Sequence, residues 1–565
     1  MRFKNWEISG FDRDIAVSFY KKEGLNPLIS VFLASRGVTN IDDAREFLGD
    51  ASSRLCDPFL LKDIDKAIDR INRAISNNEH ITIYGDYDVD GITSCALLAH
   101  WLRSKNADFD IYIPQRLCEG YGLNTAALDE LKSRGTELVI TVDCGVTAIE
   151  EAKHAKHIGL GLVITDHHEC KAELPVADAV VDPKRFDCNY PNKALAGVGV
   201  VFKLVCALEP DKDFLELLDL YGDFVAIGTV ADVMPVTEEN RELVRRGIRL
   251  LNKSPRPGIN RLLLDAFPEK IKVNTATIGF TISPRLNAAG RMGQTELSVN
   301  LLMTQDAMKA KELTGELELL NTERRRLEVE TYEDAMSMLH NYDSGDPIVL
   351  AKRGWHQGVA GIVAAKMSEF HKLPTIIICI DEEGLGRGSC RSFGSFAIYD
   401  ALESCEDILQ SFGGHQMAAG VTLVEDNIDE LRERFIRHYR NKVEHDYEPG
   451  LSIDFEVEKP ELLAIENVES MELLEPFGNG NPPPCLCIMN ASLVAISSIG
   501  DGKHTRFRIE KSNKILDCIF FSMPTENLNL REGMLVDVAF EPQINEFRGR
   551  TNVQLHVLDV RISNN

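Results

Sequence analysis

Three short apolar segments constrain the fold of this chain more than any other feature of its sequence. They cover residues 80–85, 137–142 and 161–165, and they are rich in β-branched residues. Stretches with the pattern of amphipathic helices separate them. Strands that alternate with helices in this way are typical of a parallel sheet covered by helices. The sequence therefore predicts an α/β fold with a parallel sheet between residue 80 and about residue 235.

The rest of the chain carries three further patterns. Residues 304 to about 340 contain no proline and one glycine, which predicts one long helix with Thr304 as its N-cap. At 1.5 Å per residue this helix would be roughly 50 Å long, which suits a strut between domains. A second, smaller α/β pattern follows, with strands at 348–351 and 375–380 around a helix near 359–370. Short strands dominate from residue 451 onward and predict a small β-barrel.

An acidic motif, Asp86-Tyr87-Asp88-Val89-Asp90-Gly91, directly follows the first predicted strand. Three carboxylates so close together repel one another unless a cation lies among them. The motif resembles the opening of an EF-hand loop, but that loop needs a glutamate at its twelfth position, where this chain has Leu97. A solvated acidic turn is the other alternative for this motif taken alone.

The two other strands end in similar motifs, Asp143-Cys144-Gly145 and Asp166-His167-His168. Because the carboxyl ends of parallel strands share one edge of a sheet, these side chains are expected to meet there. Asp232, where an apolar helical run ends before Pro235, is expected to join them, although alone it could be an ordinary helix-end acid.

Mixed carboxylate and imidazole ligands suit Mn²⁺ or Mg²⁺, and no cysteine has the spacing of a zinc site. A bridging aspartate can hold two such ions about 3.5–4 Å apart, which is the arrangement used for displacement at phosphorus. No Ser-His-Asp or Cys-His constellation offers a protein nucleophile. The sequence thus predicts a phosphoesterase that depends on two divalent cations.

Length and charge bound the remaining possibilities. The 565 residues predict three or four domains, and no apolar run is long enough to cross a membrane. A cytoplasmic protein is expected, since the N-terminus is too polar for a signal peptide and the cysteines are scattered. The net charge of −26 means that nucleic acid would have to bind in a local basic groove. Two stretches could form it, 241–261 and 284–291, of which the first could equally be a solvated helix face.

Taken in order, these four acidic motifs resemble the DHH phosphoesterase superfamily. The segments GFTISPRLNAAGRMG (279–293), GWHQGVAGIVAAK (354–366), FGGHQMAAG (412–420) and LEPFGNGNPPP (474–484) narrow the resemblance to the bacterial RecJ family of single-stranded-DNA-specific exonucleases. The resemblance covers nearly the whole chain after about residue 45.

The resemblance implies five parts: an N-terminal segment (1–70), a DHH catalytic domain (71–300), a connecting helix (301–342), a DHH-associated domain (343–450) and an OB-fold domain (451–565). It implies 5′-to-3′ release of 5′-mononucleotides from single-stranded DNA in recombination and repair. The expected partners are a single-stranded-DNA-binding protein and a helicase, and the expected state is a monomer. Two alternatives remain: a DHH phosphodiesterase for oligonucleotides or cyclic dinucleotides, and a non-catalytic replication scaffold.

The resemblance also implies residue roles. The metal ligands would be Asp86, Asp88, Asp90, Asp143, His167 and Asp232, with Asp143 as the bridge. Asp166 would orient the neighbouring histidine, and His168 would contact the scissile phosphate. The substrate-binding residues would be Arg116, Arg285, Arg291, Ser389, Arg391 and His415. One departure is that Cys390 stands where the family has a glycine, which leaves the local approach of backbone to substrate open.

Overall fold

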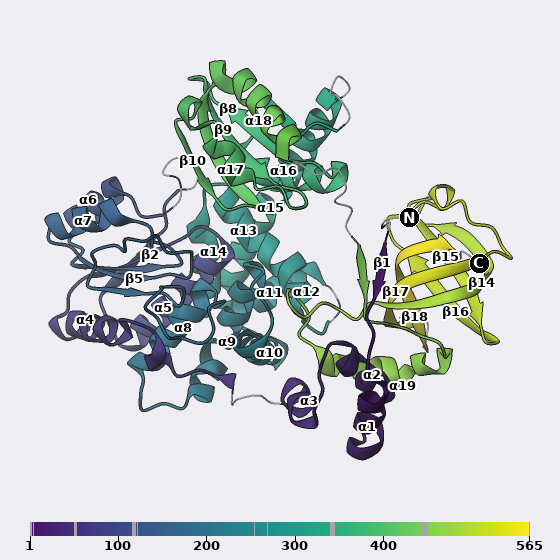
Figure 1. Cartoon of the computed structure of the whole chain (residues 1–565). Coiled ribbons are helices and arrows are strands. Elements are labelled where there is room, and N and C mark those ends of the chain that lie inside the picture. Colours follow the sequence, from purple (N-terminus) through teal and green to yellow (C-terminus); the bar gives the residue numbers. More distant parts are fainter. Residues whose placement is uncertain are drawn as a thin grey trace. The chain divides into compact units, whose positions relative to one another are not determined.

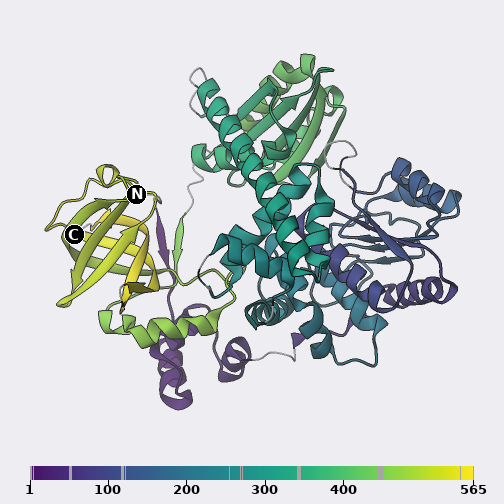
Figure 2. The ribbon, with the colours of Figure 1, turned by 180° about the vertical axis from the view of Figure 1, so that it is seen from behind.

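The chain forms two compact units in a computed structural model (Figures 1 and 2). One unit comprises residues 53–445, and the other comprises residues 1–52 together with 446–565. The structure describes residues 3, 5–49, 54–115, 120, 122–253, 255–267, 269, 271–339, 345–442, 450–547 and 549–563. Within these residues no helix is both long enough and apolar enough to cross a bilayer.

The larger unit is built around a five-stranded sheet in which every neighbouring pair of strands is parallel. Its order is β3-β2-β4-β5-β6. The strands are β2 (Ile81–Gly85), β3 (Phe109–Tyr112), β4 (Leu138–Val142), β5 (Gly161–Thr165) and β6 (Ala179–Val181). The parallel sheet and all three strands that the sequence predicted are thus confirmed.

Helices cover both faces of this sheet, because successive residues of each strand point to opposite sides. Ile140 of β4 belongs to one buried cluster, and its neighbour Val139 belongs to another. The first cluster packs against α4 (Ile64–Asn77), α5 (Val89–Ser104) and α8 (Gly197–Leu208). The second packs against α6 (Thr125–Ser133) and α7 (Ile149–His157).

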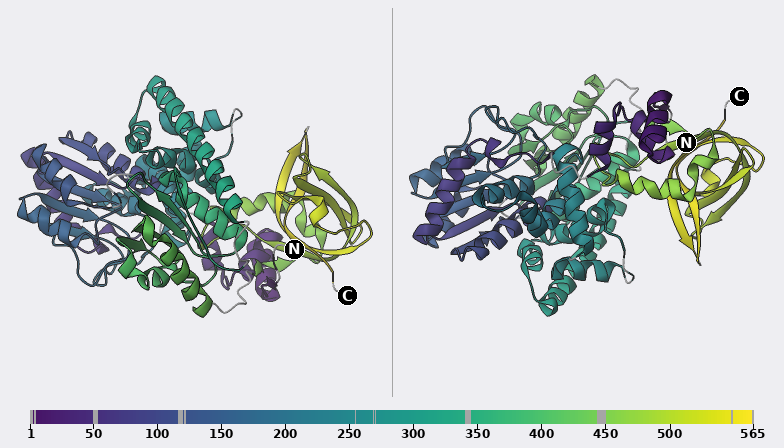
Figure 3. Two further views of the ribbon diagram at one scale, coloured as in Figure 1. Left: turned by 90° about the horizontal axis from the view of Figure 1, so that it is seen from above. Right: turned by 90° about the horizontal axis from the view of Figure 1, so that it is seen from below.

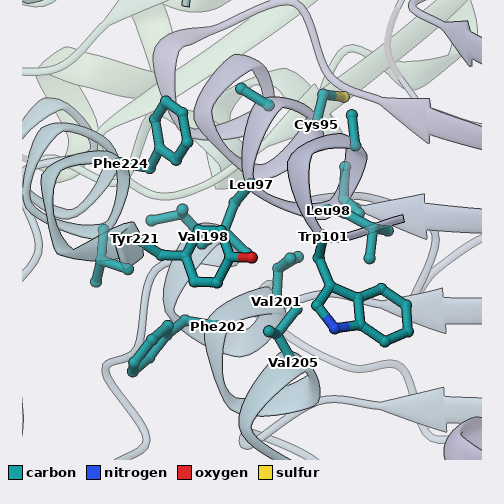
Figure 4. Close-up of a cluster of buried hydrophobic side chains, with 14 of the residues drawn as sticks. Cys95, Leu97, Leu98, Trp101, Val198, Val201, Phe202, Val205, Tyr221 and Phe224 are labelled. Atoms are coloured by element: carbon teal, nitrogen blue, oxygen red, sulfur yellow. The ribbon is translucent and has the colours of Figure 1, made fainter. Parts of the chain in front are cut away.

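Part of the first cluster lies where α5, α8 and α9 (Phe214–Ala231) meet (Figure 4). Trp101 of α5, Phe202 of α8 and Phe224 of α9 are all completely buried there. Because α5 begins at the first acidic motif and α9 ends at Asp232, this packing fixes two parts of the candidate site relative to each other.

A helical region follows α9 and leads to the long helix. Its elements are α10 (Glu238–Lys253), α11 (Pro257–Ala266), α12 (Thr275–Thr277), the π-helix η3 (Ile278–Ile282), α13 (Ser283–Arg291) and α14 (Thr295–Met303). The predicted long helix is α15 (Ala307–Met338), and it packs against α11, α13, α14 and α16.

The expected N-cap of this helix was wrong by two residues. Asp306, not Thr304, caps α15, and its side chain accepts hydrogen bonds from the backbone of Met308 and Lys309. Thr304 instead terminates α14, and its hydroxyl accepts a bond from the backbone of Asp306.

The second sheet of the larger unit has the order β10-β11-β9-β8-β7. Its strands are β7 (Ile348–Arg353), β8 (Thr375–Ile380), β9 (Leu385–Arg391), β10 (Ser411–Gly414) and β11 (Ala418–Val424). The accompanying helices are α16 (Gln357–His371), α17 (Ile398–Glu403) and α18 (Ile428–Lys442). The predicted second α/β pattern is confirmed.

The smaller unit contains a closed five-stranded barrel, as the sequence predicted. Pairing runs β14-β15-β16-β18-β17 and returns from β17 to β14. The five barrel strands are β14 (Leu486–Ile499), β15 (His504–Lys511), β16 (Lys514–Phe520), β17 (Leu535–Phe547) and β18 (Arg550–Ile562). Before them come the short strands β12 (Leu451–Ile453) and β13 (Phe455–Glu456) and the helix α19 (Ile465–Glu469), and β13 pairs with β14. Figure 3 shows the barrel from two further sides.

The N-terminal residues complete this unit. They form β1 (Trp6–Ile8), α1 (Arg13–Glu23), α2 (Pro27–Ser35) and α3 (Ile41–Leu48), and β1 pairs in parallel with β12. Phe32 of α2 shares one buried cluster with Phe540 of the barrel. Arg36 pairs with Asp454 at 2.9 Å and donates to Asn481 Oδ1 at 2.9 Å. The sequence had given no indication that these distant segments pack together.

Candidate metal centre and nucleic-acid site

The acidic motifs meet at the carboxyl edge of the parallel sheet. Asp86 follows β2, Asp143 follows β4 and Asp166 follows β5. The ligand atoms within each of three groups lie within 4.8 Å of one another: Asp86, Asp88 and Asp143; Asp90, His167 and Asp232; and Asp143, His167 and His168. Two of these groups share Asp143, and together the groups contain seven of the eight side chains that the sequence expected at this edge, all but Asp166.

Asp143 occupies a tight position between β5 and α8. Its backbone has a φ of 62°, and its N–H donates to the carbonyl of Thr165 at 3.0 Å. Gly197 opens α8 beside it, where a Cβ would lie 2.6 Å from Asp143 Oδ1. A left-handed aspartate and a close glycine therefore define where this carboxylate lies.

Asp90 is held by the N-terminus of α8. Its two carboxylate oxygens accept hydrogen bonds from the backbone of Gly197 at 2.6 Å and of Val198 at 2.9 Å. Gly228 of α9 leaves room for it, since a Cβ there would lie 2.7 Å from Asp90 Oδ1. Asp88 has a different role in the fold, because its side chain caps the first turn of α5. A strand precedes the motif and a capped helix follows it, which rules out the EF-hand alternative.

His167 lies at the centre of the cluster. Its Nε2 atom is 3.1 Å from Asp143 Oδ1, 3.6 Å from Asp232 Oδ2 and 3.8 Å from Asp90 Oδ2. Burial and then the charge of His168 lower the pKa of His167 to about 3. His167 is thus a neutral imidazole at physiological pH, the form that binds metal ions.

Without a bound cation, the negative charges of the clustered carboxylates would repel one another. Burial and the neighbouring acids raise the pKa of Asp90 and of Asp143, and burial followed by the charge of Asp88 raises the pKa of Asp232 to about 7. Asp143 Oδ1 is buried and receives no hydrogen bond from any residue that the structure describes. A divalent cation would satisfy this oxygen and neutralise its neighbours, so the residues fit metal ions well.

Asp166 is oriented toward the protein rather than the cluster. Its Oδ1 accepts from the backbone of His167 at 2.7 Å and lies 2.7 Å from His168 Nδ1, while its Oδ2 accepts from the backbone of Val146 at 2.8 Å. Burial opposes the charged form of His168, but the hydrogen bond that its Nδ1 donates to Asp166 outweighs burial and raises the pKa of His168 to about 9. His168 is therefore a cation held at the edge of the acidic cluster.

Asp182 is a neighbouring acid that the sequence reasoning missed. It directly follows β6, is completely buried, and accepts from the backbone of Lys184 at 2.6 Å. Burial and the charge of Asp166 raise the pKa of Asp182 to about 7. The strand-end rule could have found it, because the apolar run before it is the fifth strand of the same sheet.

The small-residue helix α13 borders the cluster, since a Cβ on Gly290 would lie 2.4 Å from the carbonyl oxygen of Tyr87. Its two arginines already have protein partners. Arg285 pairs with Glu318 and donates to the carbonyl of Thr281 at 3.0 Å. Arg291 donates to the carbonyl of Gly358 in α16 at 3.1 Å.

The basic stretch 241–261 is extensively paired within the part of the chain that the structure describes. Arg246 pairs with Glu242 at 2.6 Å and Arg256 with Asp223 at 2.7 Å, while Arg261 pairs with Asp265. Arg116 lies outside the described residues.

In the second sheet, Ser389 and Arg391 lie together on one face of β9. A Cβ on Gly361 of α16 would lie 3.2 Å from Arg391 Nη2 and 3.5 Å from Ser389 Oγ. Cys390 points to the opposite face and is completely buried in the core, where burial raises the pKa of its thiol to about 12. The side chain of Cys390, the departure from the family glycine, therefore packs in the core and does not lie on the face that carries Ser389 and Arg391. His415 is exposed between β10 and β11.

Three family models match the chain. They are the DHH family N-terminal domain over residues 80–229, the DHHA1 domain over residues 345–441 and the RecJ OB domain over residues 453–559.

Similar proteins are found along nearly the full length. The single-stranded-DNA-specific exonuclease RecJ of Bacillus subtilis is 40% identical over 562 residues, which covers 99% of this chain and 71% of that protein. The protein of the same name from Escherichia coli is 33% identical over 562 residues, covering 94% of this chain and 95% of that protein. The crystal structure of RecJ from Thermus thermophilus in complex with Mn²⁺ is 28% identical with a TM-score of 0.84, covering 99% of this chain and 80% of that one. The corresponding Mg²⁺ complex gives a TM-score of 0.79 at 27% identity and covers 99% of this chain and 79% of that one.

Proposed function

The chain belongs to the RecJ family of single-stranded-DNA-specific exonucleases, and from this premise we propose that it degrades single-stranded DNA in the 5′-to-3′ direction. It releases 5′-mononucleotides by metal-dependent hydrolysis and acts in recombination and repair. The observation that carries this proposal is the gathering of three overlapping ligand groups at one edge of the sheet, with Asp143 and His167 each in two of them.

The proposed ligands of one divalent cation, Mn²⁺ or Mg²⁺, are Asp86, Asp88 and Asp143. Those of a second cation are Asp90, His167 and Asp232, with Asp143 shared between the two. When bound, such ions lower the pKa of a water molecule and neutralise charge on phosphoryl oxygens.

The protein side chains supply position and charge. The 2.7 Å contact between Asp166 and His168 holds the imidazole in one orientation and keeps it protonated. A protonated His168 can donate to a phosphate oxygen as negative charge develops there. We assign Arg285, Arg291, Ser389, Arg391 and His415 to binding of the strand, and Arg116 to the same role from the family resemblance alone.

The barrel of the smaller unit is proposed to bind bases and backbone of the single strand, as OB folds do. The proposed partners are a single-stranded-DNA-binding protein and a helicase that supplies single strands. The proposed state is a monomer, and the proposed location is the cytoplasm.

Digestion of 5′-labelled and 3′-labelled strands tests the proposal. Single and double strands are incubated with Mn²⁺, Mg²⁺ or EDTA. We expect the 5′ label to appear at once as a mononucleotide, only from single strands and only with metal. Initial release of the 3′ label would contradict the polarity, and activity in EDTA would contradict the metal site. A preference for dinucleotides would favour an oligonucleotide phosphodiesterase, and inactivity under every condition would favour a scaffold.

A further inference from the structure

The segment from α12 to α13 borders the acidic cluster at two points. The π-helix η3 packs against α9, where a Cβ on Gly279 would lie 4.0 Å from Val230 Cγ1, two residues before Asp232. At its other end, Gly290 touches the backbone of Tyr87 within the first acidic motif. Gly279 is therefore close to the end of α9 that precedes Asp232, and Gly290 is close to the first acidic motif.

Phe280 directly follows Gly279, and its side chain is 82% exposed. No other large hydrophobic side chain that the structure describes is more exposed. It lies on η3, and π-helical turns are rare in proteins and frequent at functional sites. A single exposed apolar residue needs no explanation by itself, so a second observation is required.

Val233, the residue directly after Asp232, gives that observation. Its side chain is 66% exposed, and its backbone has a φ of 57°. A β-branched residue in the left-handed region is a genuine outlier, and the end of a helix ordinarily places glycine there. A strained, exposed valine therefore lies immediately beside a proposed metal ligand, and strained backbone is frequent at functional sites.

We propose that Phe280 and Val233 form an apolar rim against which a nucleobase packs beside the scissile phosphate. This inference rests on the proposed function. The acidic cluster disfavours any phosphate that no cation accompanies, whereas a nucleobase is flat and uncharged at neutral pH. The rim therefore positions the strand through a base, and it contributes to the preference for unpaired DNA because a paired base cannot turn its face toward it.

Abasic oligonucleotides test the rim in the full-length protein. Four strands are prepared, each with one abasic site, at the first, second, third or fourth nucleotide from the 5′ end. For each strand, kcat and KM are measured with Mn²⁺. We expect one position to lower kcat/KM about 10-fold in the wild type, in line with the usual strength of base stacking on aromatic side chains. The Phe280→Ala variant should have a kcat/KM on the intact strand that is lower by a similar factor, and it should no longer be sensitive to that abasic position. The Phe280→Trp variant should keep the wild-type kcat/KM and the wild-type sensitivity to that position.

Two controls separate the rim from a general defect. Phe370 in α16 is 67% exposed, and Phe370→Ala should leave all strands unaffected. Hydrolysis of bis(p-nitrophenyl) phosphate, a phosphodiester that carries no nucleobase, should change less than twofold in Phe280→Ala. If Phe280→Ala instead slows the ester as much as the strand, the side chain supports the fold of the site and the inference is wrong.

Val233→Gly provides an independent variant, because glycine relieves the left-handed backbone while removing the apolar side chain. We expect a higher melting temperature together with a higher KM for single strands. An unchanged KM would remove Val233 from the rim. If the wild type digests intact strands and strands with an abasic site at any position equally well, the inference is wrong but the proposed function stands. If the wild type is inactive on all strands, the proposed function is wrong.

Discussion

At the scale of single residues, Asp143 combines three properties that fit a bridging ligand. It belongs to two of the ligand groups, its Oδ1 lacks a hydrogen bond from the described residues, and its backbone is left-handed. Asparagine is the suitable replacement, because it has the same shape and tolerates the left-handed region, whereas alanine would add backbone strain.

Asp143→Asn is expected to lower nuclease activity by about 1000-fold or more, since the stabilisation by bound metal is worth several kcal/mol. The same variant should melt at a higher temperature than the wild type in EDTA, because one of the mutually repelling buried charges is gone. Activity assays with Mn²⁺ and thermal melts in EDTA check both parts. Full activity of the variant would refute the metal assignment.

Gly197→Ala tests the position of the same carboxylate without changing any ligand. A Cβ at residue 197 would lie 2.6 Å from Asp143 Oδ1 and 2.7 Å from Asp143 Cβ, so Asp143 must shift. We expect a loss of activity on the order of 100-fold, as for other small displacements of reacting groups. Steady-state kinetics with Mn²⁺ measures this loss.

Gly315→Ala is the matched control for this glycine substitution. Gly315 is exposed in the middle of α15, with no atom within 4 Å of an added Cβ. Its replacement should leave activity unchanged and stabilise the helix by about 0.5–1 kcal/mol. Equal kinetics for the two variants would show that the contact between Gly197 and Asp143 is unimportant.

The sequence predicted which acids gather at the sheet edge but not how each is held there. Strand-end position was enough to expect Asp143 and His167 together. The bonds from the N-terminus of α8 to Asp90 could not be predicted, because they join residues 107 positions apart in the chain. Protein partners of Arg285 were missed for the same reason, since its acidic partner lies on α15.

At the scale of elements, the C-terminal ends of α5 and α8 are joined by one carboxylate. Glu209 follows α8, accepts from Trp101 Nε1 at 2.8 Å, pairs with Lys105 and lies 3.3 Å from Lys212 Nζ. Burial opposes ionisation of Glu209, but the hydrogen bonds from Lys105 and Trp101 outweigh it and lower its pKa. The ionised group therefore stabilises the fold above its ordinary pKa of 4.5, and this contribution is lost as the pH falls through the lower pKa of the folded state.

Glu209→Gln should accordingly destabilise the larger unit by about 1–3 kcal/mol at pH 7, and by less at acidic pH. Urea unfolding followed by the fluorescence of Trp101, with the two other tryptophans replaced by phenylalanine, measures this difference at pH 7 and pH 4. An equal loss of stability at both pH values would contradict the charge-dependent role.

Elements with strong local signals were predicted well, and those that depend on distant partners were not. The strands of the parallel sheet are apolar runs bounded by acids or glycine, so their limits agree to within one residue. The start of α15 was misassigned because Thr304 and Asp306 are both good capping residues, and only the structure shows which of them caps the helix. β1 has three residues and exists because β12 pairs with it.

At the scale of the whole molecule, the smaller unit is discontinuous in sequence. Its core includes Phe32 from the N-terminal helices and Phe455 from the C-terminal part. Residues 446–565 expressed alone should therefore expose apolar surface and fail to give a cooperative melt. A fusion in which a flexible linker joins residues 1–52 to this fragment should restore one, as circular dichroism and limited proteolysis would show. A stable, protease-resistant fragment 446–565 would contradict this dependence.

The split origin of this unit sets the order of events on the ribosome. Residues 1–52 leave the exit tunnel before their partners in residues 446–565, and roughly 400 residues, or about 20–80 s at ordinary elongation rates, separate the two. During that interval the apolar side of α2 has no barrel to pack against, while the segment that contains the acidic cluster emerges and can fold. A polypeptide that ended after residue 445 would thus contain the whole acidic cluster but not the barrel that covers α2.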